Sequence, residues 1–209
     1  MSEDHYFSAD PSVAFQRQPV VASVWGHDLE LVSGSGVFAR GRVDIGTSIL
    51  FRETEPPTGG RILDLGCGYG VIGLACAVAA PDAVVTAVDV NQRALLLAGE
   101  NAASLGVSDR FVAVLPDQVD PGATYDEIWS NPPIRIGKQE LHALLLHWLP
   151  RLAPGGRAWL VVQKNLGSDS LQSWMQQTLP DLMGPVTVTR EASSKGFRVL
   201  SVHRSSTAS

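Results

Sequence analysis

The stretch Arg61-Ile62-Leu63-Asp64-Leu65-Gly66-Cys67-Gly68-Tyr69-Gly70 decides the fold of this chain of 209 residues. Its first half, residues 61–65, has the apolar character of a buried strand, and an apolar segment of helical length follows at residues 71–80. A strand that turns through glycines into a helix places backbone N–H groups at the helix N-terminus, where they can receive a ligand. In a parallel sheet such a ligand lies in the crevice beyond the carboxyl ends of the strands. The stretch therefore predicts an α/β fold with a binding site at its glycine turn.

Outward from this stretch, segments with strand and helix patterns alternate along the chain. We expect further strands at residues 83–89, 111–115, 125–130 and 157–163, and helices at residues 91–105, 139–149 and 168–177. Asn91 is placed to cap the first of these helices and Gly106 to end it. Two last strands, at residues 185–189 and 197–203, have no helix between them and form an antiparallel pair. The predicted fold class is α/β: a Rossmann-like, doubly wound, mostly parallel seven-stranded sheet with an antiparallel edge hairpin.

The first 60 residues are predicted to form an N-terminal extension of a main domain at residues 61–209. Apolar segments on both sides of Gly26-His27-Asp28 indicate a short β-hairpin. A short helix is expected up to Arg52, with Asp44 as its N-cap. The proline- and glycine-rich residues 56–60 indicate the linker between extension and domain.

The composition is typical of a soluble globular protein. Hydrophobic residues make up 44% of the chain and charged residues 18%, which suffices for one sizeable core. With only Cys67 and Cys76, a disulfide framework is not expected, whereas a reducing compartment is. Because we find neither a signal segment nor an apolar run of membrane-spanning length, we expect a cytoplasmic protein without a membrane partner. The net charge of −5 argues against nucleic-acid binding over the whole surface, but it is compatible with a local basic patch.

A second informative segment is Asn131-Pro132-Pro133-Ile134, which follows a short apolar strand. Consecutive prolines have a fixed φ and no N–H, so they end the strand in a stiff turn. Pro132 also keeps Asn131 out of the α region. The turn therefore presents one amide side chain and bare carbonyl oxygens, which can accept hydrogen bonds from an amine. A plain strand-ending corner is the alternative explanation of the same residues.

The glycine turn can be compared with a dinucleotide site. Residues 68–73 match GxGxxG, and Asp89 follows roughly 20 residues later, as a nicotinamide dehydrogenase would need. That fingerprint begins directly after the strand, however, and the residue in that place is Gly66. Counted from Gly66, the spacing is GxGxG, with Val71 where the third glycine should stand. The position of the glycines relative to the strand end therefore disfavours a dinucleotide-binding site.

The glycine turn and the Asn-Pro-Pro turn together resemble class I S-adenosylmethionine-dependent methyltransferases that modify nitrogen. Over almost the whole chain the sequence is similar to the RsmC-type branch, the ribosomal small-subunit RNA guanine-N2 methyltransferases. The segments that carry this resemblance are residues 36–38 with 43–47, 62–70, 126–137 and 195–199. Members of that family often carry two methyltransferase-like halves, and this chain resembles the catalytic half only.

The resemblance implies S-adenosylmethionine as the cofactor. The glycines would let the backbone approach the amino-acid part of the cofactor, and the Asp89 carboxylate would accept both ribose hydroxyls. The implied cofactor-binding residues are Asp64, Gly66, Cys67, Gly68, Gly70, Asp89, Val90, Asp117 and Asn131. From the residues alone, Asp89 could instead cap a helix beside Asn91, and Asp117 could belong to an ordinary turn.

The implied reaction is methyl transfer to the exocyclic amine of a guanine in ribosomal RNA. The implied catalytic residues are Asn131, Pro132, Pro133 and Ile134, with the Asn131 Oδ1 atom and the Pro132 carbonyl accepting the amine hydrogens. The residues expected to contact the RNA substrate are Phe38, Arg135 and Lys138, and the cations Lys195 and Arg198 could join them at phosphates. No metal is expected, because the histidines of the chain show no metal-ligand spacing.

One position departs from the family pattern. The residue after the second proline is usually aromatic in amine methyltransferases, and here it is Ile134. The stacking contribution, roughly 1–3 kcal/mol per base, would be reduced. A protein-amide or small-molecule N-methyltransferase is therefore the alternative, and the acidic net charge favours it. A cofactor-binding protein without catalysis is a third possibility, which the intact Asn131-Pro132-Pro133 disfavours.

Overall fold

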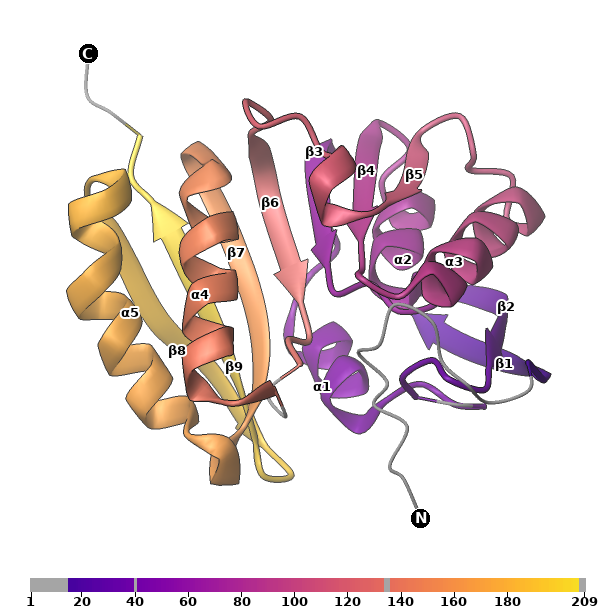
Figure 1. Ribbon diagram of the computed structural model, residues 1–209, viewed down its shortest axis with the longest axis horizontal. Helices are drawn as coiled ribbons and strands as arrows, with labels where there is room; N and C mark the ends of the chain where they lie inside the picture. The colour runs from indigo at the N-terminus through magenta and orange to yellow at the C-terminus, as the bar shows by residue number, and fades with distance from the viewer. Residues whose placement is uncertain (1–14, 40, 134–135, 207–209) are drawn as a thin grey trace.

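A seven-stranded sheet forms the centre of the molecule, which a computed structural model describes over residues 15–39, 41–133 and 136–206 (Figure 1). The strand order is β5-β4-β3-β6-β7-β9-β8. The strands are β3 (Gly60–Leu65), β4 (Ala83–Val88), β5 (Phe111–Val114), β6 (Tyr125–Ser130), β7 (Leu152–Gln163), β8 (Val186–Ser194) and β9 (Phe197–Arg204). The first five are parallel, and β9 runs antiparallel to both β7 and β8. The predicted Rossmann-like sheet with an antiparallel edge hairpin is confirmed.

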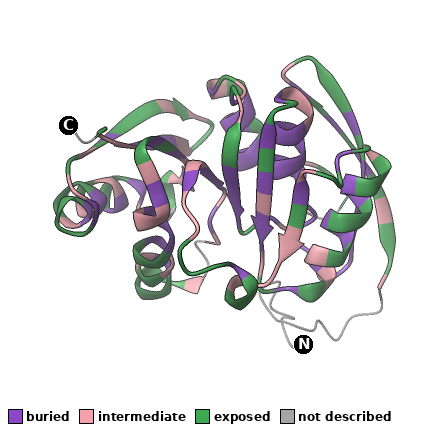
Figure 2. Ribbon diagram, turned by 90° about the horizontal axis from the view of Figure 1, so that it is seen from above, coloured by how far each residue is buried: buried purple, intermediate pink, exposed green. Residues whose placement is uncertain are grey.

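Helices cover both faces of this sheet, because successive strand residues point to opposite sides. Ile62 belongs to one hydrophobic cluster together with Leu74, whereas the next residue, Leu63, belongs to a second cluster together with Leu145. The first cluster lies under α1 (Ile45–Glu53), α2 (Val71–Ala79) and α3 (Gln92–Ser104), and the second lies under α4 (Lys138–Trp148) and α5 (Ser168–Met183). Figure 2 shows buried residues along the central strands and exposed residues on the outer sides of the helices.

The N-terminal hairpin of β1 (Arg17–Val24) and β2 (His27–Gly34) forms a separate two-stranded sheet that packs beside α2 and α3 (Figure 1). Its buried side chains belong to the same hydrophobic cluster as those of α2. The buried amide of Asn101 in α3 joins it to the rest of the molecule. Asn101 Oδ1 accepts from Val32 N at 2.8 Å, and Nδ2 donates to Val32 O at 3.0 Å and to Tyr69 O at 2.9 Å. One side chain thus connects β2, α3 and the glycine turn.

Helix ends follow the expected capping residues. Asp44 is the N-cap of α1 and Asn91 the N-cap of α3, and each side chain accepts two backbone N–H groups of its helix. Gly106, with φ of 68°, follows the end of α3 in the left-handed conformation.

Three boundaries differ from the expectation by five residues or more, and the first is the end of β8, which lies at Ser194 rather than at residue 189. Residues 152–156 were expected to precede the strand, yet β7 begins at Leu152, and the β6–β7 register shifts between Tyr125 and Glu127. A bulge therefore accommodates the proline and glycines of this segment. Helix α5 runs to Met183 rather than to residue 177, because the spacing of its buried residues Leu171, Met175, Leu179 and Met183 continues through Pro180.

The Asn101 contacts yield a stability prediction. Replacing Asn101 with Ala leaves Val32 N–H, Val32 C=O and Tyr69 C=O without this partner in a buried place, so we expect a loss of about 2–4 kcal/mol in the free energy of unfolding. Gly99→Ala, in the exposed part of the same helix, is the matched control. A Cβ there meets nothing within 4 Å, so we expect a gain of about 0.5–1 kcal/mol. Urea unfolding measures both changes in the free energy of unfolding. A loss below about 1 kcal/mol for Asn101→Ala would contradict the stabilising role of the Asn101 hydrogen bonds.

Candidate functional site

The candidate site lies at the carboxyl ends of β3, β4 and β6. Leu65 at the end of β3 pairs with Val88 of β4 on one side and with Ser130 of β6 on the other. The Ser130 hydroxyl donates to Leu65 O at 2.7 Å. Figure 1 shows the ends of β3 and β6 side by side, above the N-terminal part of the fold that contains α1. The glycine turn, Asp89 and the Asn-Pro-Pro turn therefore meet at one edge of the sheet, as the sequence predicts.

The glycine turn adopts backbone angles that only glycine takes without strain. Gly66, Gly68 and Gly70 have φ of 74°, 55° and 91°, in the left-handed region. A Cβ on Gly70 would lie 3.1 Å from Ala98 Cβ, so this glycine lets α2 and α3 approach closely. A Cβ on Gly68 would meet nothing within 4 Å, so this part of the turn faces open space. The turn therefore leaves room for a ligand against its backbone.

Asp64 lies beneath the glycine turn and is fully buried. Its Oδ2 atom accepts from Gly73 N at 2.8 Å. Its Oδ1 atom has no hydrogen-bond partner among the described residues. Burial raises the pKa of Asp64 to about 7, against the lowering effect of the Gly73 hydrogen bond. An enclosed acceptor with free lone pairs is therefore present under the turn.

Asp89 connects the glycine turn to the start of α3. Its Oδ2 atom accepts from Gly68 N and its Oδ1 atom from Asn91 N, each at 2.9 Å. Burial raises the pKa of Asp89, and these backbone donors oppose the shift. Each carboxylate oxygen keeps a second lone pair for a further donor. The helix-capping alternative thus describes part of what Asp89 does, and it leaves acceptor capacity for a ligand.

Asn131 directly follows β6 and is half-buried. Its Nδ2 atom donates to Asp44 Oδ2 at 2.8 Å and to Thr47 Oγ1 at 3.0 Å, at the N-cap and in the first turn of α1. The adjoining Pro133 lies against the glycine turn, since a Cβ on Gly66 would be 3.8 Å from Pro133 Cδ. The amide and the glycine turn are therefore neighbours.

The remaining residues predicted for the site are distributed around this edge. Phe38, after β2, is 42% exposed, and Val90, after β4, is 46% exposed. Asp117 is exposed in the 3-10 helix η1 (Pro116–Gln118), which follows β5 at the same edge. Lys138 is exposed at the start of α4.

Three further predicted residues need separate comment. Cys67 is buried, and burial raises the pKa of its thiol, so the side chain is a packing residue and its backbone lines the turn. Ile134 and Arg135 lie outside the described residues.

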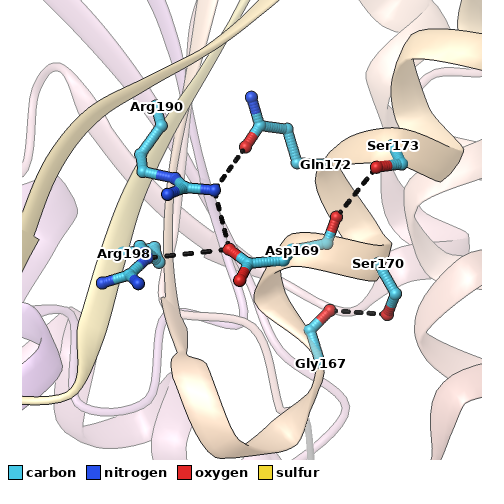
Figure 3. Close-up of polar contacts among 7 residues, drawn as sticks. All are labelled: Gly167, Asp169, Ser170, Gln172, Ser173, Arg190 and Arg198. Atoms are coloured by element: carbon cyan, nitrogen blue, oxygen red, sulfur yellow. Dashed lines mark hydrogen bonds and ion pairs between the residues drawn. The ribbon is translucent and has the colours of Figure 1, made fainter.

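Arg198 differs from the surface cation that the sequence suggested (Figure 3). Its side chain is only 14% exposed, and its Nε atom lies 3.7 Å from Asp169 Oδ1. Arg190 Nη2 is 2.8 Å from the same oxygen. The two arginines, from β9 and β8, thus hold the hairpin to the start of α5. Lys195, in the turn between these strands, is exposed.

The contact of Asn131 with Asp44 and Thr47 is absent from the sequence prediction. Asp44 was identified there only as a helix cap, and Thr47 only as part of a similar segment. The partners are separated by 87 and 84 residues, so no local pattern connects them. An asparagine after a buried strand and two polar residues at the start of a helix do not by themselves indicate that they contact one another.

No group of three His, Cys, Asp or Glu side chains that could hold a metal ion occurs within residues 15–39, 41–133 and 136–206. Over the same residues, none of the helices has the length and apolar character needed to cross a membrane.

Comparison with known proteins agrees with this geometry. The family model described as methyltransferase small domain matches residues 28–201. The uncharacterized protein YbxB of Bacillus subtilis is 36% identical over 203 residues, which cover 96% of this chain and 98% of that protein. The ribosomal RNA small subunit methyltransferase C of Pseudomonas aeruginosa is 33% identical over 203 residues. This match covers 94% of the chain but 58% of that enzyme, in agreement with the predicted resemblance to a catalytic half.

A solved structure shows the same fold. The 16S rRNA N2 G1207 methyltransferase RsmC of T. thermophilus, in complex with AdoMet and guanosine, superimposes with a TM-score of 0.75. The match covers 94% of this chain and 52% of that chain, at 22% sequence identity.

The buried Asp64 carboxyl yields a pH prediction. Its pKa in the folded protein, about 7, lies above the ordinary value of 3.8, so the folded state keeps a proton that the unfolded state loses. The contribution of Asp64 to stability is therefore present below about pH 4 and is lost as the pH rises towards 7. Asp64→Asn keeps an acceptor for Gly73 N and removes this titration.

We expect the Tm of Asp64→Asn, relative to wild type, to rise by about 5 °C or more between pH 4.5 and pH 7.5. Thermal unfolding of the free protein at a series of pH values measures it, with the exposed Asp82→Asn as control. A Tm difference that does not change with pH would contradict the assignment.

Proposed function

The chain belongs to the methyltransferase small domain family, and from that premise we propose that it transfers a methyl group from S-adenosylmethionine to the exocyclic amine of a guanine in ribosomal RNA. The observation that carries this proposal is the place of Asn131. An amide held by two side chains of α1 lies beside a glycine turn that leaves room for a ligand. Such an arrangement suits an enzyme that holds an amine next to a bound cofactor.

The residues around the turn suit the cofactor in chemical terms. We assign the backbone at Gly68, which faces open space, to the amino-acid part of S-adenosylmethionine. The free lone pairs of Asp89 suit the ribose hydroxyls. Asp64 is enclosed beneath the turn, and we assign it to holding the start of α2 under the cofactor through its bond with Gly73 N. Val90 and Asp117 are assigned to the adenine end. When bound, S-adenosylmethionine would supply a methyl group on a cationic sulfur. Transfer of this group to the amine would leave a neutral thioether and release one amine proton to water.

The contribution of the chain itself is positioning. The nitrogen of an exocyclic amine is a poor nucleophile, because its lone pair is delocalised into the ring. Acceptance of its two hydrogens by Asn131 Oδ1 and the Pro132 carbonyl would favour a pyramidal nitrogen with an available lone pair. Asn131 Oδ1 has the capacity for this, since no described residue donates a hydrogen bond to it. Fixed acceptors of this kind act without reorganisation during the reaction.

Ribosomal RNA is the proposed substrate on two grounds. The Pseudomonas relative carries the name of a ribosomal RNA methyltransferase, and the T. thermophilus structure contains guanosine. Lys138 and Lys195 are exposed on the segments that follow β6 and join β8 to β9, at the same edge as Asn131. These cations can meet phosphates, while Phe38 offers an exposed ring to a base.

A protein amide or a small molecule is the second candidate substrate. The observation that favours it is Ile134, which replaces the aromatic residue usual at this position and offers a base less stacking. The reaction at the amine would be the same, so the substrate has to be decided by product analysis.

The first test is methyl transfer by the Asn131→Ala variant. We expect wild type to transfer labelled methyl groups from S-adenosylmethionine to unmodified ribosomal RNA, and Asn131→Ala to lose about 100-fold or more in kcat. The exposed Asn165→Ala is the matched control and keeps its rate. Ribosomal proteins and a metabolite extract are offered in parallel. Label that enters only protein or metabolites would reject the RNA substrate.

The second test is cofactor binding. At 100-fold excess over its Kd, S-adenosylmethionine should stabilise the protein by about 2.7 kcal/mol, or roughly 5–10 °C in Tm, whereas NAD should not. Asp89→Ala should abolish most of this shift, because it removes the proposed ribose acceptor. Asp82→Ala, an exposed acid before β4 and thus at the other end of the strand, should keep it. An equal shift in both variants would remove Asp89 from the cofactor site.

A further inference from the structure

We propose that Asp44 and Thr47 are positioning residues that fix the orientation of the Asn131 amide for methyl transfer. This inference rests on the proposed function and names two residues that the reaction would need beyond the Asn-Pro-Pro turn. The contact that carries it is short and twofold: Nδ2 of Asn131 lies 2.8 Å from Asp44 Oδ2 and 3.0 Å from Thr47 Oγ1.

The chemistry of Asp44 decides which end of the amide faces α1. An amide has an oxygen and an NH2 group of nearly equal size, and only the NH2 group can donate. Asp44 Oδ2 already accepts from Gly46 N at 2.7 Å and Thr47 N at 3.3 Å, as the cap of the helix. Rotation of the amide by 180° would place its oxygen against this carboxylate. The NH2 group is therefore held towards α1, and Oδ1 points to the other side.

Thr47 completes the orientation by using the second hydrogen of the NH2 group. The group has two hydrogens and meets two acceptors, one carboxylate oxygen and one hydroxyl oxygen. Thr47 is only 3% exposed, so its side chain is held in place by packing. An amide with both donors occupied has one function left, which is acceptance at Oδ1.

The charge of Asp44 adds to this geometry. A carboxylate that accepts from one end of an amide polarises it, so its oxygen becomes a stronger acceptor. An amine that is being methylated gains positive charge, and its hydrogens bind more strongly to such an oxygen. The contact would therefore favour the transition state more than the bound amine.

The first turn of α1 is a rigid support for this contact. Ile49, Leu50 and Phe51 bury the helix in the core. A Cβ on Gly46 would lie 2.9 Å from Asp44 Oδ2 and 3.0 Å from Phe197 Cε1, so only glycine allows this close packing. A site residue held by a packed helix is placed more accurately than one held by a loop.

A helix cap alone does not account for the arrangement. Capping of α1 requires only that Asp44 accept backbone N–H groups, which it does within three residues of itself. The bonds to Asn131 leave the helix and reach the end of β6. The two roles can therefore be separated by substitution.

The first experiment removes the Thr47 acceptor and keeps the cap. We expect Thr47→Val to lower kcat about tenfold or more on unmodified ribosomal RNA, with the Tm shift caused by S-adenosylmethionine unchanged. Thr47→Ser, which restores the hydroxyl, should recover kcat. Ser48→Ala is the matched control, because it removes a hydroxyl whose partner among the described residues is Asp44 O in the same turn. Unchanged kcat in Thr47→Val, or no recovery in Thr47→Ser, would overturn the role of Thr47.

The second experiment is a double-mutant cycle. Asn is as good an N-cap as Asp, so Asp44→Asn removes the charge and largely preserves the helix. We expect Asp44→Asn to lower kcat about tenfold or more in the wild-type background and to have no further effect in the Asn131→Ala background. An equal loss in both backgrounds would mean that Asp44 acts on structure alone and would overturn the proposal.

A readout that needs no methyl transfer keeps this inference separate from the proposed function. The side-chain NH2 signal of Asn131 is assigned in a 15N spectrum by its disappearance in Asn131→Ala. We expect slow exchange of these hydrogens with water in wild type, and exchange faster by about tenfold or more in Asp44→Asn and Thr47→Val. Fast exchange in wild type would overturn the orientation by Asp44 and Thr47. If RNA is not methylated but the Asn131 NH2 hydrogens exchange slowly, ribosomal RNA is rejected as the substrate. The orientation of Asn131 by Asp44 and Thr47 is then supported independently of the proposed function.

Discussion

The central position of β3 is the constraint on which the site depends. This strand pairs with β4 on one side and with β6 on the other, and all three are parallel. Their carboxyl ends therefore lie at one edge, so that the glycine turn, Asp89 and Asn131 meet although they are far apart in the sequence. The hydrogen bond from the Ser130 hydroxyl to Leu65 O joins the ends of β6 and β3, from which the two turns begin. The chemistry proposed for the chain follows from this juxtaposition.

Much of the fold could be predicted, because it depends on local patterns. The apolar strand before Gly66 and the glycines after it specify a strand, a turn and a helix over a few residues. Asp44 and Asn91 predict the starts of α1 and α3, since a capping side chain acts within three residues of itself. Such features are determined by residues close to them in the sequence. The same holds for the Asn-Pro-Pro turn, whose prolines permit few backbone conformations.

Other features depend on contacts that the sequence does not encode locally. Asp44 meets Asn131 only because α1 packs beside the end of β6, and no spacing in the chain indicates this. Arg198 and Lys195 are equivalent as charges in the sequence, but the fold places one against Asp169 and leaves the other exposed. The bulge in β7 and the continuation of α5 through Pro180 likewise result from packing that overrides local turn and breaker signals. Sequence reasoning thus indicated Asn131 as a site residue and missed its contacts with Asp44 and Thr47.

We propose that this chain methylates the exocyclic amine of guanine with the help of an oriented acceptor. The most direct measurement is mass spectrometry of the nucleosides released from unmodified ribosomal RNA after incubation with the protein and S-adenosylmethionine. We expect N2-methylguanosine with wild type and its loss with Asn131→Ala. A methyl group found on another atom of a nucleoside, or on protein alone, would contradict it.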